Sequence, residues 1–235
     1  MAVQVEYFRD KEMLYNRAFQ LIEEQLQSGP SVFGLATGGT MEPLYSLLVN
    51  SDLDFSNCKS FNLDEYIGLP KTDPNSYYTY MANNLFTKKP FAQSFLPNGE
   101  AINLEKEAKQ YEQLLQREAI DFQLLGVGEN GHIGFNEPGT PFTSTTHVVN
   151  LTESTRTANA RYFYTIEDVP KQAITMGISS ILRAKKIVVI ALGEKKRRAI
   201  EQLIAGPQTE DIPITALCNH PQVIVLTNIK VNPIE

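Results

Sequence analysis

Cysteine, long apolar runs and surplus basic residues are all scarce in this sequence of 235 residues. Its two cysteines, Cys58 and Cys218, have neither metal-ligand nor CxxC spacing, which favours free thiols in a reducing compartment, although one disulfide is possible by count. The longest aliphatic stretch, residues 187–192, is too short to cross a bilayer, and the first ten residues carry charges where a signal peptide needs an apolar run. We therefore expect a cytoplasmic protein with no membrane partner.

The charge balance further limits the classes of partner that this protein can bind. The chain has 21 Lys and Arg against 27 Asp and Glu, a formal net charge of -6. Nucleic acid and anionic membranes both require a basic face, so neither is expected as the main partner. A small anionic ligand held by a few placed cations is compatible with this balance.

Short apolar or β-branched segments alternate with amphipathic ones, and this predicts alternating strands and helices. The predicted strands are 3–8, 32–36, 59–63, 122–126, 187–192 and 223–227. The predicted helices begin after Asp10, near Met41 and after Asn103, and two more cover 154–162 and 194–204. The order favours an α/β fold, an open, doubly wound, mostly parallel sheet with helices on both faces (Rossmann-like), in a single domain of residues 1–235.

Ligands of such sheets bind beyond the carboxyl ends of the strands, so we expect the functional side chains in the loops that follow strands. The first is a turn with free backbone N–H groups, two hydroxyls and little bulk, which suits a phosphate, although a plain tight turn would use the same residues. This turn consists of Thr37, Gly38, Gly39 and Thr40.

Two adjacent carboxylates, Asp64 and Glu65, follow the third predicted strand. Neighbouring carboxylates repel each other, and the repulsion can raise the pKa of one of them and make it a usable base. In the plainer alternative, Asp64 caps a turn while Glu65 faces water.

The loop of residues 126–138 is rich in glycine and formally matches the dinucleotide pattern GxGxxG. It continues to Pro138 without helical periodicity, whereas a dinucleotide loop opens a helix, so no dinucleotide site is predicted. Its candidates for chemistry are Asn130, His132 and Glu137, because histidine titrates near pH ~6.5 and a carboxylate can fix its tautomer. A metal site is disfavoured, since His132 and Glu137 lack zinc-ligand spacing.

Four cations, at positions 195–198, lie where the last strand-to-helix turn is predicted. A helix start is already positive, so the cluster is either a solvated face or a place where a bound anion makes at least one cation useful. Lys196 is the candidate from this cluster. Arg161 is a second candidate cation, with Arg156 as its alternative.

Together these segments make the sequence similar to the glucosamine-6-phosphate deaminase family, also called glucosamine-6-phosphate isomerases, and to its shorter bacterial members. The similarity runs from about residue 32 to 225 and rests on FNLDEYIGLP (61–70), GENGHIGFNEP (128–138) and TGGT (37–40), in the family's order. It implies conversion of glucosamine 6-phosphate to fructose 6-phosphate and ammonia, with a sugar phosphate as the small-molecule partner and no cofactor or metal.

The resemblance also implies roles for individual residues. Asp64 matches the base that moves a proton between carbon 2 and carbon 1, and His132 matches the residue that opens the sugar ring. Glu137 and Asn130 match the positions that orient and tune His132. The resemblance assigns the phosphate to Arg161, Lys196 and the turn of Thr37, Gly38, Gly39 and Thr40. Many members have aspartate where this chain has Asn130, so Glu137 alone would supply negative charge beside His132.

Two alternatives and one regulatory expectation remain. A 6-phosphogluconolactonase shares the fold and a similar glycine-rich loop but hydrolyses an ester without a carbon-acid base. A non-catalytic sugar-phosphate sensor would keep the phosphate site, yet it would lose the acid-base residues and usually carry a DNA-binding segment. The longer hexameric members respond to N-acetylglucosamine 6-phosphate through basic residues after the NEP segment and an extended C-terminus. This chain lacks those features, so we expect a monomer without such regulation.

Overall fold

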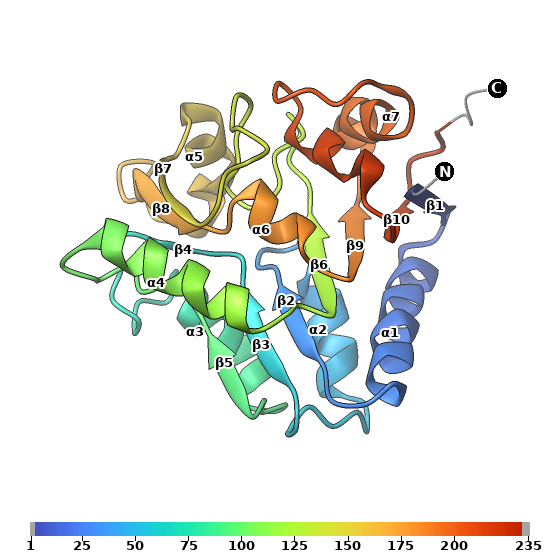
Figure 1. Ribbon diagram of the computed structural model, residues 1–235, viewed down its shortest axis with the longest axis horizontal. Coiled ribbons are helices and arrows are strands. Elements are labelled where there is room, and N and C mark those ends of the chain that lie inside the picture. Colours follow the sequence, from blue (N-terminus) through green and yellow to red (C-terminus); the bar gives the residue numbers. More distant parts are fainter. Residues whose placement is uncertain (1–2, 232–235) are drawn as a thin grey trace.

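Seven strands, all paired in parallel, form the central sheet of the computed structural model, which describes residues 3–231. The strand order is β1-β10-β9-β6-β2-β3-β5 (Figure 1). The bounds are β1 Val3–Tyr7, β2 Val32–Leu35, β3 Lys59–Asn62, β5 Gln93–Phe95, β6 Phe122–Gly126, β9 Lys186–Ala191 and β10 Val223–Thr227.

All six predicted strands are present in this sheet, each within one residue of its predicted ends. The central strands β6, β9 and β10 are apolar along most of their length, and their side chains are almost entirely buried. Continuous apolar strands are typical of a parallel sheet that is covered on both faces. Strand β5 was not predicted, because its three residues are largely exposed and carry no apolar run.

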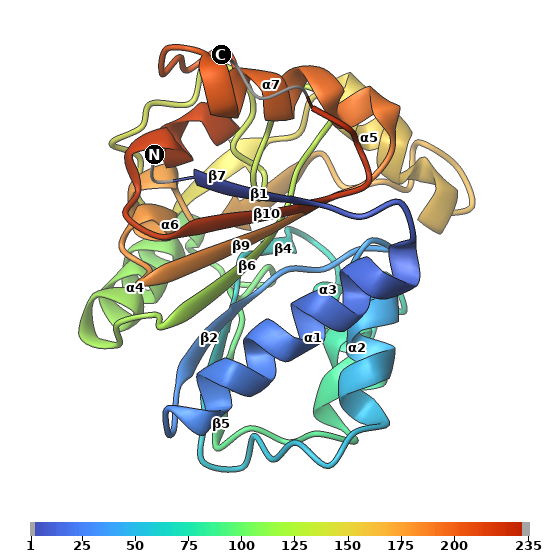
Figure 2. The ribbon, with the colours of Figure 1, turned by 90° about the vertical axis from the view of Figure 1, so that its right-hand side faces the viewer.

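Helices cover both faces of the sheet, which confirms the doubly wound prediction (Figure 2). Helices α1 (Lys11–Gln27), α2 (Glu42–Val49) and α3 (Tyr77–Met81) lie on one side, and α4 (Leu104–Arg117) and α6 (Ile178–Leu182) lie on the other. The predicted caps are present: Asp10 accepts the N–H of Glu12 at 2.8 Å, and Asn103 accepts the N–H of Lys106 at 2.9 Å. Within residues 3–231, no helix has both the length and the apolar character needed to span a bilayer.

A second, antiparallel sheet of three strands was not predicted. It has the order β4-β8-β7, with β4 Asp64–Tyr66, β7 His147–Asn150 and β8 Gln172–Thr175. These strands have at most four residues, and β7 is only half-buried, so neither strict alternation nor an apolar run marks them. Residues 64–66, expected to be loop, are therefore strand.

Two predicted helices near the site are only partly α-helical. Residues 154–162 divide into α5 (Glu153–Asn159) and a 3-10 turn, Ala160–Tyr162. Residues 194–204 begin with the 3-10 turn Glu194–Lys196 before α7 (Arg197–Ala205). The predicted single domain covers residues 1–235, of which 1–2 and 232–235 lie outside the described part.

Candidate functional site

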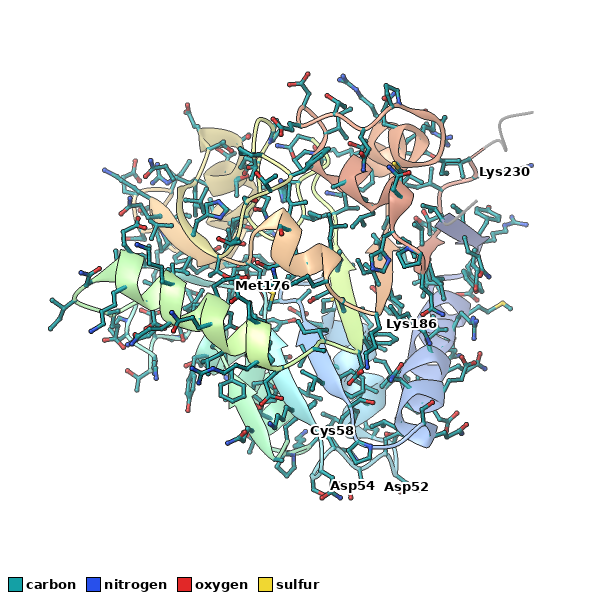
Figure 3. All side chains as sticks on the ribbon, in the orientation of Figure 1. Asp52, Asp54, Cys58, Met176, Lys186 and Lys230 are labelled. Carbon is teal, nitrogen blue, oxygen red and sulfur yellow. The ribbon has the colours of Figure 1, made fainter. Side chains whose placement is uncertain are left out.

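Four loops meet at the carboxyl edge of the central sheet because the strands they follow are neighbours. Strands β9, β6, β2 and β3 are adjacent, and the chain order reverses between β6 and β2. The turn of residues 37–40 and the loop of residues 127–138 therefore flank the switch point, where open α/β sheets bind ligands. Figure 3 labels Cys58, which precedes β3, at the opposite edge of the sheet, and Met176 near the middle of the molecule.

Asp64 lies against the glycine-rich loop. As the first residue of β4 it pairs with Thr175 of β8, and it is only 6% exposed. Its Oδ2 is 3.5 Å from the point where a Cβ on Gly134 would stand. No described residue donates a hydrogen bond to its carboxylate. Burial, and secondarily the charge of Glu65, raise the pKa of Asp64 to about 8. The carboxylate is therefore more basic than an ordinary one, and no described residue hydrogen-bonds to it.

Glu65 contradicts the plainer expectation that it faces water. It is only 4% exposed, and its carboxylate accepts three backbone N–H groups, from Tyr66 at 2.8 Å, Tyr77 at 2.9 Å and Tyr78 at 2.9 Å. Nor does Asp64 cap a turn: Glu65 and Ser76 bind the free N–H groups at the start of α3. Strand pairing of β4 turns consecutive side chains to opposite sides, which separates the two carboxylates.

His132 belongs to a small network within its own loop. Its Nδ1 is 3.6 Å from Glu137 Oε2, and its backbone N–H donates to Asn130 Oδ1 at 3.2 Å. The Asn130 amide in turn donates to Glu137 Oε2 at 2.8 Å. Burial raises the pKa of Glu137, but His132, Thr155 and Asn130 lower it to about 2. Glu137 is thus a fixed negative charge facing one nitrogen of the imidazole.

The glycines of this loop have roles other than binding a dinucleotide. A Cβ on Gly128 would stand 2.2 Å from the His132 ring, so only glycine lets the imidazole lie against this backbone. Gly131 and Gly134 have φ of 86° and 56°, in the left-handed region that glycine adopts without strain. No helix follows β6 before residue 153, which agrees with the rejection of a dinucleotide loop.

The turn of residues 37–40 is held by tyrosines. The hydroxyl of Tyr80 donates to the carbonyl of Gly38 at 2.9 Å, and that of Tyr15 donates to the carbonyl of Thr40 at 2.8 Å. The N–H of Gly39 donates to the hydroxyl of Tyr162 at 3.2 Å, which joins the turn to the segment that carries Arg161. The carbonyls of Gly38 and Thr40 and the N–H of Gly39 are thus all engaged within the protein, and the bond to Tyr162 brings the turn beside the segment that carries Arg161.

Two of the four cations at 195–198 are engaged in surface ion pairs. Arg197 binds Glu194 at 2.7 Å and Lys195 binds Glu129 at 3.2 Å. Lys196 is half-buried and forms no ion pair among the described residues. Its pKa is lowered by burial and by the nearby charges of Arg161 and Lys195, although Glu129 acts in the opposite direction. The charge of Arg161 thus acts on Lys196, and a bound anion would stabilise both cations.

Arg161 and its alternative Arg156 have different surroundings. Arg156 donates to the carbonyls of Ile166 at 2.8 Å and Val169 at 3.2 Å, so it fastens a loop. Arg161 is exposed and lies over the ring of Tyr162, 4.8 Å from its centroid. Arg161 is therefore the arginine free to meet a ligand beside Lys196.

Sequence reasoning missed the threonines that hold Glu137 and border Asp64. Thr152 donates to Glu137 Oε1 at 3.2 Å, and Thr155 donates to the same oxygen. Thr175 accepts the N–H of Phe135 at 3.1 Å next to Asp64. Only Thr152 had a local signal, since a threonine before a helix with an acidic first turn is a typical N-cap. Within the described part of the chain, no group of three or more His, Cys, Asp or Glu side chains is arranged to hold a metal ion.

Fold and site define an α/β protein whose acid-base groups and cations gather at the carboxyl edge of a parallel sheet. Residues 9–225 match the family of glucosamine-6-phosphate isomerases/6-phosphogluconolactonase, and the chain belongs to that family. It is 59% identical over 206 residues to a glucosamine-6-phosphate deaminase of Lysinibacillus sphaericus, covering 88% of this chain and 93% of the relative.

Solved structures show the same relationship. A monomeric glucosamine-6-phosphate deaminase, 45% identical, superposes with a TM-score of 0.91 over 97% of each chain. A 6-phosphogluconolactonase from Leishmania guyanensis superposes with a TM-score of 0.78 at 20% identity, over 97% of this chain and 96% of the other. The second likeness concerns the fold alone.

Proposed function

We propose that this protein converts glucosamine 6-phosphate to fructose 6-phosphate and ammonia. One observation carries the proposal: a buried carboxylate with no internal hydrogen bond, Asp64, lies against the loop that holds the His132–Glu137 pair. The relatives that share most of this chain's length at 59% and 45% identity are glucosamine-6-phosphate deaminases.

The site residues fit each step of such a reaction. His132, next to the negative Glu137, would transfer a proton between the anomeric hydroxyl and the ring oxygen and so open the sugar. Asp64 would then remove the proton from carbon 2 and return it to carbon 1 of the enolamine. The ketimine that results is hydrolysed by water to the ketone and ammonia. Proton transfer at adjacent carbons requires a base fixed against one face of the open chain, as burial in β4 provides.

The phosphate does not react, so its task is anchorage. Lys196 and Arg161, beside the turn of residues 37–40, would hold it and place carbons 1 and 2 between Asp64 and His132. Binding energy from this remote group would be used to position the reacting carbons. The sugar phosphate is thus the expected partner, and we further propose a monomer that acts in the cytoplasm.

The lactonase alternative has a weaker basis. Ester hydrolysis requires an activated water but no base for a carbon acid, and it leaves Asp64 without a task. A sugar-phosphate sensor would need the cations but not the acid-base residues. Both alternatives lack an explanation for a buried carboxylate with a pKa of about 8 beside the histidine loop.

The test is a coupled ammonia assay on the wild type and on Asp64→Asn. The amide keeps the shape of the side chain but cannot accept a proton, so turnover should fall roughly 10²–10⁴-fold while substrate binding persists. Acid release from the lactone by the wild type, without ammonia release from the amino sugar, would favour the lactonase instead. Near-normal turnover by Asp64→Asn would remove Asp64 as the base.

A further inference from the structure

We propose that Glu65 is a positioning residue for Asp64: its buried carboxylate ties β4 to the first turn of α3 and keeps a fixed negative charge beside the base. The inference rests on the proposed function, because it concerns the proton that Asp64 would transfer. Nothing in the chemistry requires Glu65 to touch the substrate. Its side chain leaves β4 on the opposite side from that of Asp64.

Strand β4 has three residues and helix α3 has five, so neither element is stable alone. Glu65 Oε1 accepts the N–H groups of Tyr66 and Tyr77, and Oε2 accepts that of Tyr78. One carboxylate therefore fastens the backbone directly after Asp64 to a helix start eleven residues further on. A displaced Glu65 would displace the strand that holds Asp64.

Both oxygens of Glu65 receive N–H donors, and no described group is placed to accept a proton from it, so a protonated acid would leave its O–H without an acceptor. Burial raises the pKa of Glu65, and the three N–H groups and Lys71 oppose that effect. The bonded arrangement thus suits the ionised form. An ionised Glu65 adjacent to Asp64 disfavours a second negative charge there and makes Asp64 hold its proton more strongly.

The other titratable groups around Asp64 do not compete with this influence. Tyr66 follows it on β4, Tyr77 approaches from α3, and Tyr111 approaches from α4; burial raises the pKa of all three, so they stay neutral at working pH. Glu65 is the one carboxylate among the described residues whose charge contributes to the raised pKa of Asp64.

A cavity of about 150 Å³ lies on the far side of Glu65 and supplies a matched control. Its lining includes Lys71, Tyr78 and Glu100, and the Lys71 ammonium lies 5.4 Å from the centre of the Tyr78 ring. Glu100 is exposed and accepts the N–H of Lys71 at 3.0 Å, so it is a carboxylate on the same cavity that forms no hydrogen bond to β4. Glu100→Gln therefore replaces a carboxylate by an amide on the same cavity, as Glu65→Gln does, but at a residue that is not adjacent to Asp64.

The experiment measures kcat/KM for ammonia release between pH 5.5 and 9.5 in the wild type, Glu65→Gln, Glu65→Asp and Glu100→Gln. Glu65→Gln should move the acid limb down by about one pH unit, because the charge beside Asp64 is gone. Glu65→Asp keeps the charge but withdraws the carboxylate by one methylene, so the limb should hold while kcat falls roughly 10–100-fold. Glu100→Gln should match the wild type. Ionisations of the substrate are common to all four enzymes and cancel in the comparison.

The outcomes separate this inference from the proposed function. A wild type that releases no ammonia defeats the proposed function and leaves no profile to compare. An active wild type whose acid limb is unchanged in Glu65→Gln overturns the role given to Glu65. If Glu65→Gln melts below the assay temperature, Glu65→Asp decides: a limb that moves although the charge is kept also overturns it.

Discussion

At the residue scale, the backbone of the loop of residues 127–138 has the shape that the His132 side chain needs. The His132 ring lies against Gly128, whose own N–H donates to the carbonyl of His132 at 2.9 Å. Glu137 and Asn130 then hold the loop from the other side. The position of the His132 imidazole therefore depends on residue 128 having no Cβ.

Gly128→Ala should therefore impair the enzyme severely. The new Cβ would stand 2.2 Å from the imidazole, which must rotate or shift away from Glu137. A displacement of about 1 Å in a catalytic group can cost ~10²-fold in rate, so kcat/KM should fall by about that factor. Gly126→Ala is the control, because its Cβ meets only the flexible end of Met41 at 3.5 Å. Equal activity in both alanine variants would contradict the packing role of Gly128.

The burial of Asp64 should also make the protein less stable as pH rises from about 4 to 8. In the unfolded chain its pKa returns to ~3.9, against about 8 in the native state. Between these values the native state binds a proton that unfolding releases, so stability falls as pH rises through this window. Asp64→Asn removes the effect. The variant should exceed the wild type in free energy of unfolding by a margin that grows from pH 5 to pH 8, reaching about 1–4 kcal/mol.

Denaturant unfolding at a series of pH values measures this margin. Asp52→Asn is the control, since Asp52 is exposed at the opposite edge of the sheet (Figure 3) and should show no growing margin. A constant or shrinking difference between Asp64→Asn and the wild type would indicate that Asp64 is ionised in the native protein throughout.

At the element scale, the long apolar strands were predictable and the short elements of the site were not. Strands β6 and β10 match their predicted bounds because their buried faces leave an unbroken apolar run in the sequence. Strand β4 contains Asp64 and Glu65, two residues that are rare in strands and ordinarily exposed. Their burial depends on contacts with α3, across a loop, and with β8, more than a hundred residues away, so no local pattern records it.

The same reason governs the candidate site. The residue types of His132, Glu137 and Asp64 are visible in the sequence, whereas the contact of Asp64 with Gly134 arises only from sheet order. The run at 195–198 looked uniform, yet the fold pairs Lys195 and Arg197 with carboxylates and leaves Lys196 half-buried. Tertiary contacts, rather than sequence spacing, therefore separate Lys196, the candidate anion ligand, from the paired cations Lys195 and Arg197.

This difference within one element gives a matched pair of variants. Lys196→Met removes the half-buried ammonium near Arg161, so the substrate phosphate should lose an anchor and KM should rise at least tenfold. Lys195→Met removes a neighbouring charge that is 78% exposed and paired with Glu129, and it should leave KM within twofold. Inhibition by inorganic phosphate should weaken in the first variant alone. A comparable rise of KM in both would mean that only the general positive field matters.

At the scale of the whole molecule, all parts of the proposed site come from one chain. The base, the histidine loop, the turn of residues 37–40 and Lys196 follow four neighbouring strands of one sheet, and Arg161 comes from the 3-10 turn after α5. No second subunit is needed to complete the arrangement. Such a protein can be active as a monomer, provided that its regulation does not require a ligand bound at an interface between subunits.

Saturation by glucosamine 6-phosphate should accordingly be hyperbolic and indifferent to N-acetylglucosamine 6-phosphate. Residues 139–149 contain no Lys or Arg, so a second anionic sugar would meet no cation there. The segment is also fastened internally, since Gly139 and Phe142 donate backbone N–H groups to Glu210 at 2.8 and 3.3 Å. Initial rates with and without the acetylated sugar, alongside light scattering for the expected monomer, measure both properties. Sigmoidal saturation that the acetylated sugar converts to a hyperbola would show that a cooperative assembly exists, because coupling between sites needs at least two states with different affinities.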